Sequence, residues 1–175
     1  RFCALKLDMM KAYDRLEWPY LKAVMIKLGF SPRFTETVMR CVSSVTFSVL
    51  FNGGCLDGFR PTRGLRQGDP ISPYLFLLAA EGLSCLLKSQ VGVQGIAVAL
   101  TAPLVNHLLF ADDSLLFFEA NEESATRFKG LLRVYCQASG QRINVDKSSI
   151  FFSKGVADLT KAAVKVILEV HNEAL

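Results

Sequence analysis

The chain has 175 residues, 51% of them hydrophobic and 21% charged, which suits one globular domain with a buried core and excludes a disordered or fibrous protein. The formal net charge of +4, from 20 Lys and Arg against 16 Asp and Glu, permits a nucleic-acid partner without requiring one. The five cysteines are widely spaced, odd in number and without a CxxC pair, so they suggest reduced core residues rather than a disulfide framework or a zinc site.

The first third of the chain is predicted to hold a strand followed by two helices. Residues 2–7 are nearly all apolar and lead directly into Asp8, which predicts a buried strand with a carboxylate at its C-terminal end. Apolar residues at helical spacing over 21–28 predict a helix that stops at Gly29. A Ser-Pro pair begins a second helix over residues 31–43.

The middle of the chain is predicted to form a hairpin and then a helix. Residues 45–51 have strand composition and Asn-Gly-Gly follows them as a hairpin signal, so a partner strand is expected from Cys55. Residues 64–73 are irregular and lead into a helix with apolar positions at helical spacing as far as Leu86. The apolar stretch 74–87 is interrupted by Glu-Gly and is shorter than the roughly 20 residues that a bilayer requires, so no membrane span is expected.

The last third begins with two short predicted strands, residues 104–110 and 115–118, which place Asp112 and Asp113 at the tip of a hairpin. The remaining elements are a helix, a strand and a helix, over residues 121–138, 145–153 and 158–170. This order of elements predicts a single α+β domain with a mainly antiparallel sheet and helices packed on one of its faces.

The sequence LLFADDSLLFF, residues 108–118, places two adjacent aspartates between apolar runs. At about 4 Å and an effective dielectric constant near 20, two carboxylates repel by about 4 kcal/mol, so a pair held partly out of water needs a compensating charge. Two interpretations fit the pair alone. One is a cation site, and the other is a solvated turn, which Asp favours because its side chain bonds its own backbone.

Three carboxylates, those of Asp8, Asp112 and Asp113, lie at the ends of predicted central strands, where one sheet could bring them together. Two Mg²⁺ ions held by hard oxygen ligands serve an in-line phosphoryl displacement, because one activates the attacking oxygen and the other neutralises the leaving oxygen. We therefore expect a two-metal site at these strand ends, with Mn²⁺ as a substitute for Mg²⁺.

Four segments resemble, in order and spacing, the palm motifs of reverse transcriptases: ALKLDMMKAYDRLEW, GLRQGDPISPYLF, LLFADDSLLFF and GQRINVDKSSIFF. Together they cover roughly residues 1–153. The KAYD and FADD forms are similar to those of non-LTR (LINE-type) retrotransposon enzymes, particularly plant ones, although those relatives usually carry Tyr where Phe110 stands. The resemblance implies a polymerase palm fold and RNA-directed DNA polymerase activity in retrotransposition.

The resemblance also implies catalytic roles. Asp8 and Asp112 would hold both Mg²⁺ ions, and Asp113 would complete the cluster, so the three carboxylates grouped above become the metal ligands. Lys147 matches a lysine that protonates the leaving pyrophosphate, a role that needs a positioned ammonium group. A surface lysine at the start of a strand is an equally simple interpretation of Lys147.

Substrate contacts are implied at five further positions. Tyr13 matches the steric-gate aromatic that blocks a ribose 2′-OH and so selects deoxynucleotides, and an amphipathic aromatic at a helix start is the alternative. Lys11 and Ala12 stand where the family places the incoming triphosphate against the backbone. Gln67 and Gly68 match the nucleotide and template contact, where the amide offers a donor and an acceptor and Gly lets the backbone approach closely.

Some nearby residues carry weaker signals. Arg60, Arg63 and Arg66 precede the Gln-Gly pair, and a solvated face and phosphate contacts suit them equally well. The two histidines, His107 and His171, are interpreted as packing or surface residues rather than metal ligands.

The chain begins at Arg1, and its first Met lies inside a patterned segment, so we expect a piece of a longer polypeptide. Residues 1–175 are interpreted as a partial reverse transcriptase domain, a palm without fingers, thumb and endonuclease. The implied partners are an RNA template, a DNA primer, deoxynucleoside triphosphates and the missing regions, with no membrane. The implied location is intracellular, and nuclear during target-primed synthesis.

Two other functions stay open at this point. A catalytically inactive remnant would only bind nucleic acid, although the three aspartates, Tyr13 and Gln67 are all present. A palm-like nucleotide cyclase or metal phosphatase would use the same carboxylates, but the Gln67 loop and the Lys147 motif argue against it.

Overall fold

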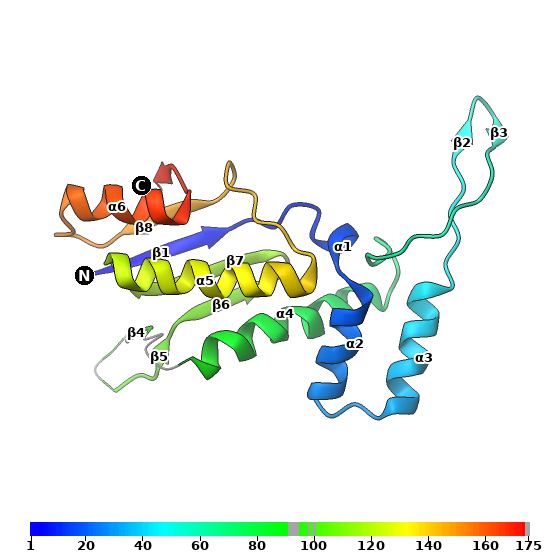
Figure 1. The fold of residues 1–175 in the computed structure, drawn as a ribbon, viewed down its shortest axis with the longest axis horizontal. Coiled ribbons are helices and arrows are strands. Elements are labelled where there is room, and N and C mark those ends of the chain that lie inside the picture. Colours follow the sequence, from blue (N-terminus) through cyan, green and yellow to red (C-terminus); the bar gives the residue numbers. More distant parts are fainter. Residues whose placement is uncertain (91–94, 98, 100, 174–175) are drawn as a thin grey trace.

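The computed structural model describes residues 1–90, 95–97, 99 and 101–173 of the chain. The molecule is elongated (Figure 1). A sheet with α4, α5 and α6 beside it forms one end, and α2, α3 and a projecting hairpin form the other. No helix among the described residues is long and apolar enough to cross a membrane.

A five-stranded sheet, in the order β6-β7-β1-β8-β9, organises the first of these ends. The central strand β1 (Phe2–Leu7) pairs antiparallel with β7 (Asp113–Glu119) on one side and with β8 (Ser149–Phe152) on the other. The strand β6 (His107–Phe110) is antiparallel to β7, and β9 (Asn172–Glu173) is parallel to β8. The predicted α+β fold with a mainly antiparallel sheet is confirmed.

Six helices accompany the sheet in the described part of the chain: α1 (Ala12–Arg15), α2 (Trp18–Lys27), α3 (Pro32–Ser43), α4 (Ser72–Ser89), α5 (Glu122–Ser139) and α6 (Asp158–Leu168). Local signals set several of their ends. The side chains of Ser31 and Asn121 accept backbone N–H bonds at the starts of α3 and α5, and Gly140 ends α5 at a φ of 76°.

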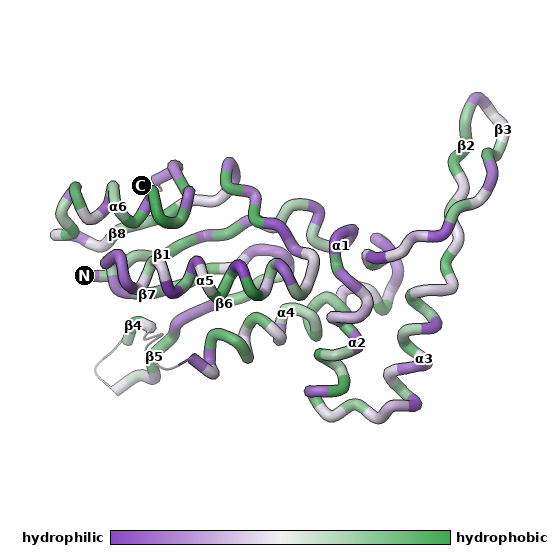
Figure 2. Tube along the Cα trace, in the orientation of Figure 1, coloured by the Kyte–Doolittle hydropathy of each residue, from purple (hydrophilic) through white to green (hydrophobic). Residues whose placement is uncertain are grey.

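One face of the sheet carries the core. Alternate residues of β1 and β7 are buried, among them Leu5, Leu7 and Leu116, and Phe118 stacks on Phe128 of α5 with 4.5 Å between the ring centroids. The helix α5 alternates hydrophilic and hydrophobic residues along its length, as a helix with one packed face must (Figure 2). The helices beside the sheet, α4, α5 and α6, therefore lie on one of its faces, as predicted, and the other face stays open.

The strands differ from the prediction more than the helices do. The hairpin predicted from residue 45 pairs only over β2 (Leu50–Phe51) and β3 (Gly54–Cys55), besides one bridge between Phe47 and Phe59. It projects away from the molecule, so most of its residues have no further strand to join (Figure 1). A strand was wrongly predicted over residues 145–148, where the chain forms a turn before β8.

The region around the acidic pair also needs correction. The predicted strand 104–110 is interrupted at Asn106, so that β5 (Leu104–Val105) instead pairs with the short β4 (Ile96–Ala97). Asp113 belongs to β7 rather than to the hairpin tip, because it pairs with Phe110. The tip therefore consists of Ala111 and Asp112 alone.

Candidate active site

The order of the strands brings the end of β1 to the β6–β7 turn. Leu7, the last residue of β1, pairs with Ser114 near the start of β7. Because the two strands are antiparallel, Asp8 leaves the sheet beside the turn that carries Asp112. Segments far apart in the sequence thus supply carboxylates to one end of the sheet.

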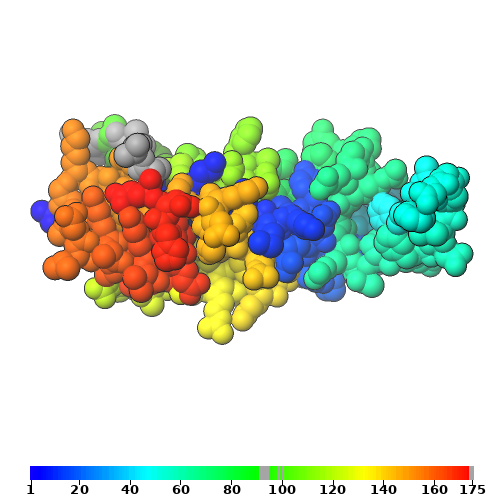
Figure 3. Space-filling view, turned by 90° about the horizontal axis from the view of Figure 1, so that it is seen from above, coloured from blue at the N-terminus to red at the C-terminus, as the bar shows by residue number. Residues whose placement is uncertain are grey.

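A cavity of about 320 Å³ opens at this end of the sheet. It collects seven of the nine predicted site residues: Asp8, Lys11, Ala12, Tyr13, Gln67, Asp112 and Lys147. Its remaining wall is formed by Met9, Met10 and Asn144, which sequence reasoning had not placed there as site residues. In the space-filling view, the blue segment around α1 lies between the yellow-orange segment that follows α5 and the green segment before α4 (Figure 3).

The two other predicted residues, Asp113 and Gly68, do not line this cavity. Asp113 forms an ion pair with Lys6, with 3.4 Å between the Oδ2 and Nζ atoms, and both side chains are about half exposed. Within the described part of the chain, no three His, Cys, Asp or Glu side chains gather closely enough to hold a metal ion. The three-carboxylate cluster therefore stays a prediction, whereas Asp8 and Asp112 do share one cavity.

Two residues at this site have a backbone conformation that L-amino acids rarely adopt. Lys11 has a φ of 49° and Ala111 a φ of 52°, and neither is a glycine. Lys11 stands at the start of α1 in the cavity wall, and Ala111 directly precedes Asp112. Such strain persists only where the surrounding structure fixes it, and it occurs most often at functional sites.

Segment 141–148 runs alongside the residues that follow β1. The N–H of Met10 donates to the carbonyl of Arg142 at 2.8 Å, and Met9 pairs with Ile143. The side-chain amide of the buried Gln141 donates to the carbonyl of Ala12 at 2.8 Å. These bonds bring the turn that bears Lys147 to the cavity.

The loop with the Gln-Gly pair is bound to α1 and to the residue after it. The N–H of Leu65 donates to the carbonyl of Tyr13, and the N–H of Gly64 donates to the carbonyl of Leu16, both at 2.8 Å. The ring of Tyr13 stacks on Phe76 of α4, with 4.9 Å between the centroids and 9° between the planes. Tyr13 and Gln67 thus reach the same cavity from two elements that are bonded to each other.

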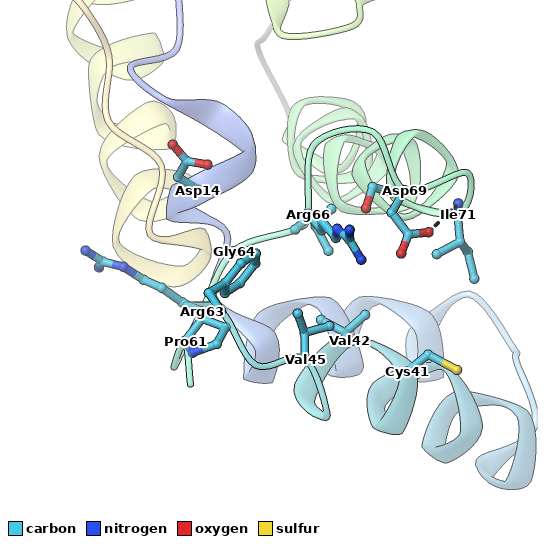
Figure 4. Close-up of a pocket in the computed structure, with 13 residues that line it drawn as sticks. Asp14, Cys41, Val42, Val45, Pro61, Arg63, Gly64, Arg66, Asp69 and Ile71 are labelled. Atoms are coloured by element: carbon cyan, nitrogen blue, oxygen red, sulfur yellow. Dashed lines mark hydrogen bonds between the residues drawn. The ribbon is translucent and has the colours of Figure 1, made fainter. Parts of the chain in front are cut away.

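A second cavity, of about 250 Å³, lies behind this loop and against α3 (Figure 4). Arg66 and Asp69 border it from the loop, and Cys41 and Val42 border it from α3. Arg63 also lines the cavity, but the end of its side chain extends away from it and forms an ion pair with Glu17, with 3.3 Å between the Nη1 and Oε1 atoms. Of the three arginines that precede the Gln-Gly pair, Arg63 thus has a structural partner and Arg66 faces a cavity.

His107, on β6, lies beside the α4 helix. Its ring nitrogens lie 3.0 Å from the hydroxyl of Ser84 and 2.6 Å from the side-chain oxygen of Asn106. Burial, followed by the nearby Lys88 ammonium, lowers the pKa of His107 from its ordinary value of 6.5. This histidine therefore supports the fold outside the cavity.

The donors in the first cavity suit a divalent cation of the Mg²⁺ type. Asp8 and Asp112 offer hard carboxylate oxygens and Asn144 offers an amide oxygen, which are the ligand types that Mg²⁺ takes. Lys11 and Lys147 on the same wall supply positive charge suited to phosphate groups. The cavity therefore combines the chemistry of a metal site with that of a polyphosphate site.

Comparison with known protein families gives a match over nearly the whole chain. Residues 2–167 match the family described as reverse transcriptase (RNA-dependent DNA polymerase). An uncharacterised mitochondrial protein of Arabidopsis thaliana is 51% identical over 73 residues, which are 39% of this chain and 60% of that protein.

Two proteins of mobile elements are similar over most of the chain. An uncharacterised protein of transposon TX1 from Xenopus laevis is 32% identical over 147 residues, 83% of this chain and 11% of that protein. A retrovirus-related Pol polyprotein of a type-2 retrotransposable element from Drosophila melanogaster is 30% identical over 149 residues, 85% and 14% of the two chains. The chain thus spans a small part of these relatives.

Solved structures of telomerase share the fold. The apo enzyme of Candida tropicalis, truncated from its C-terminal domain, superposes with a TM-score of 0.66 over 90% of this chain and 32% of that chain, at 17% identity. Telomerase of Candida albicans, in complex with a fragment of telomeric RNA, gives a TM-score of 0.65 over 90% and 28% of the two chains, also at 17% identity.

Proposed function

This chain belongs to the reverse transcriptase family, and we propose that it forms the palm of an RNA-directed DNA polymerase of the non-LTR retrotransposon type. The observation that carries the proposal is the shared cavity. Four motif segments that are widely separated in the sequence each supply at least one residue to its wall. A cavity lined by these carboxylates and lysines is expected of a nucleotidyl-transfer site.

The proposed reaction extends a DNA primer on an RNA template. The primer 3′-OH attacks the α-phosphate of a deoxynucleoside triphosphate in line, and pyrophosphate leaves. Asp8 and Asp112 are the residues in the cavity that would hold Mg²⁺, or Mn²⁺ in its place, and Asp113 would join them after release from Lys6. Bound divalent ions would supply charge neutralisation at the attacking and leaving oxygens.

The remaining cavity residues would bind the nucleotide and transfer protons. Lys11 and the backbone at Ala12 face the position proposed for the triphosphate, and Lys147 would donate a proton to the leaving pyrophosphate. Tyr13, fixed by its stacking on Phe76, would exclude a ribose 2′-OH. Gln67 and the adjacent Gly68 would contact the nucleotide and its template base.

The parent polypeptide would supply the regions that a palm requires. Fingers, thumb and endonuclease regions are the proposed intramolecular partners, together with the RNA template and DNA primer. Copying of retrotransposon RNA at a chromosomal target would place the reaction in the nucleus. The relatives that match over most of this chain are several times longer, which leaves room for such regions.

Primer extension on an RNA template tests the proposal, using the parent polypeptide with Mg²⁺. Asp112→Asn should abolish extension, because it removes one carboxylate from the cavity. Asp158→Asn is the matched control, since Asp158 is fully exposed at the start of α6, a helix that lies away from α1 and the cavity (Figure 1). A folded parent polypeptide without extension activity would instead favour the nucleic-acid-binding remnant.

A further inference from the structure

Ser148 is a buried polar residue between the two parts of the proposed active site. Its relative exposure is 0%, yet its side chain carries a hydroxyl group, which is costly to bury without hydrogen bonds. The hydroxyl accepts a bond from the N–H of Asp8 at 3.2 Å and donates a bond to the carbonyl of Asn144 at 2.7 Å. One side chain thus connects Asp8 to the turn over residues 144–148.

Asp8 needs such a partner because the strand ladder ends before it. The last pair between β1 and β8 is Lys6 with Ser149, so the N–H of Asp8 lies beyond the regular ladder. The carbonyl of Asp8 accepts a bond from the N–H of Asn144 at 2.9 Å. Both backbone polar groups of Asp8 are therefore bonded to the turn that carries Lys147.

The opposite side of the same turn is held by Asn172 of β9. Its side-chain amide donates to the carbonyls of Asp146 and Ser148, at 2.7 and 3.1 Å. Asn172 lies beyond residues 2–167, over which the chain matches its family. The turn is thus bonded on its inner side to Asp8 and on its outer side to the edge of the sheet.

We propose that Ser148 and Asn172 are positioning residues that hold Asp8 and the Lys147 turn in one fixed arrangement. This inference rests on the proposed function for its catalytic consequence. A carboxylate that binds a cation and an ammonium that donates a proton to the leaving group must keep their spacing through the reaction, because a displacement of about 1 Å can cost roughly a hundredfold in rate. The Ser148 hydroxyl fixes that spacing through backbone bonds.

The first test measures backbone amide hydrogen exchange by NMR in this chain, without metal or substrate. Ser148→Ala should speed exchange of the Asp8 amide by about tenfold, the effect expected for loss of one buried hydrogen bond. Asn172→Ala, at an exposed side chain that endangers folding less, should speed exchange at Ser148 and Lys147 but leave β1 unchanged. Ser84→Ala is the matched control: Ser84 is 3% exposed, and its hydroxyl lies 3.0 Å from Nε2 of His107, outside the cavity.

The second test uses primer extension by the parent polypeptide as a function of Mg²⁺ concentration. Ser148→Ala should raise the Mg²⁺ concentration for half-maximal extension several-fold, and Ser84→Ala should leave it unchanged. Unchanged Asp8 exchange in Ser148→Ala, or equal effects of the Ser148 and Ser84 variants, would overturn the inference. A wild-type protein that extends no primer would refute the proposed function instead, and the exchange data would still decide the role of Ser148.

Discussion

The attachment of the Gln67 loop to α1 can be measured by substituting alanine for glycine at two positions, Gly64 and Gly68. They have nearly the same backbone conformation, with φ of 88° and 86°. A Cβ on Gly64 would lie 2.7 Å from the carbonyl oxygen of Asp14, whereas no described atom lies within 4 Å of a Cβ on Gly68. The two alanine variants therefore differ in one respect, the close approach of the loop to α1.

The expected losses in stability follow from these contacts. Placing alanine in the left-handed region costs roughly 1–2 kcal/mol, and this term applies to both variants. Gly64→Ala must also move the loop and weaken the two bonds that Gly64 and Leu65 donate to Leu16 and Tyr13, each worth about 1 kcal/mol. We expect Gly64→Ala to lower the free energy of unfolding by about 1–2 kcal/mol more than Gly68→Ala does.

Urea denaturation of the chain measures this difference, with Gly29→Ala as a third variant. Gly29 has a φ of 90°, a Cβ on it would have no described atom within 4 Å, and it lies outside the site. Gly29→Ala and Gly68→Ala should lower the free energy of unfolding by equal amounts. If Gly64→Ala lowered the free energy of unfolding no more than these two substitutions did, the loop would not be held tightly against α1. The positioning of Gln67 by that contact would then be refuted.

Three further predictions concern the cavity and the sheet. Tyr13→Ala should raise ribonucleotide incorporation relative to deoxynucleotide incorporation by about tenfold or more, measured with single nucleotides. Burial lowers the pKa of His107 below 6.5, so between the folded and the unfolded pKa the unfolded chain binds a proton that the folded chain does not. The free energy of unfolding should therefore fall as the pH drops below 6.5 toward the folded pKa. His107→Gln should reduce this dependence of the unfolding free energy on pH, measured by urea denaturation at several pH values. Lys6→Met should change stability by less than about 0.5 kcal/mol, since its ion pair is half exposed, but should tighten Mn²⁺ binding by freeing Asp113.

The elements that the sequence predicts well are those with local signals. Two elements have the predicted bounds: the strand at residues 2–7 and the helix that begins after Ser31. Their signals, an apolar pattern and capping residues, lie at neighbouring positions in the sequence. Gly140 ends α5 in the left-handed conformation, which glycine adopts freely. Helix ends and a buried strand therefore need no knowledge of distant residues.

The strands that were predicted too long pair over fewer residues than their composition indicates. Residues 45–49 form one bridge, between Phe47 and Phe59, with the returning arm of their own hairpin, and residues 145–148 form a turn, because pairing depends on the facing segment as well as on composition. The two-residue β9 was not predicted, since it forms only by lying against β8. Sheet edges are thus set by tertiary structure.

The candidate site also combines features that the sequence predicts with contacts between distant residues that it does not predict. Seven of the nine residues that the motif resemblance singled out line one cavity, and their roles stay predictions; the resemblance gave no partner for Asp113 and no role for Ser148. Lys6 lies opposite Leu115 in the pairing of β1 with β7, two positions from Asp113 on the same face, and no local pattern sets that register. The Ser148 hydroxyl accepts a bond from Asp8, 140 positions away, and no local sequence pattern predicts such a contact.

The strained turn at Ala111 gives a final way to separate stability from activity. Ala111→Gly removes a Cβ from the left-handed region at a φ of 52°, and it also frees the unfolded chain, so we expect a net gain of up to about 1 kcal/mol in unfolding free energy. Asn52→Gly is the control at a φ of 48° on the distant hairpin, where Asn already tolerates this conformation and little change is expected. Primer extension should fall only in Ala111→Gly, because a more flexible turn no longer fixes the Asp112 carboxylate. A stabilised Ala111→Gly variant with full activity would show that the strain serves no catalytic purpose.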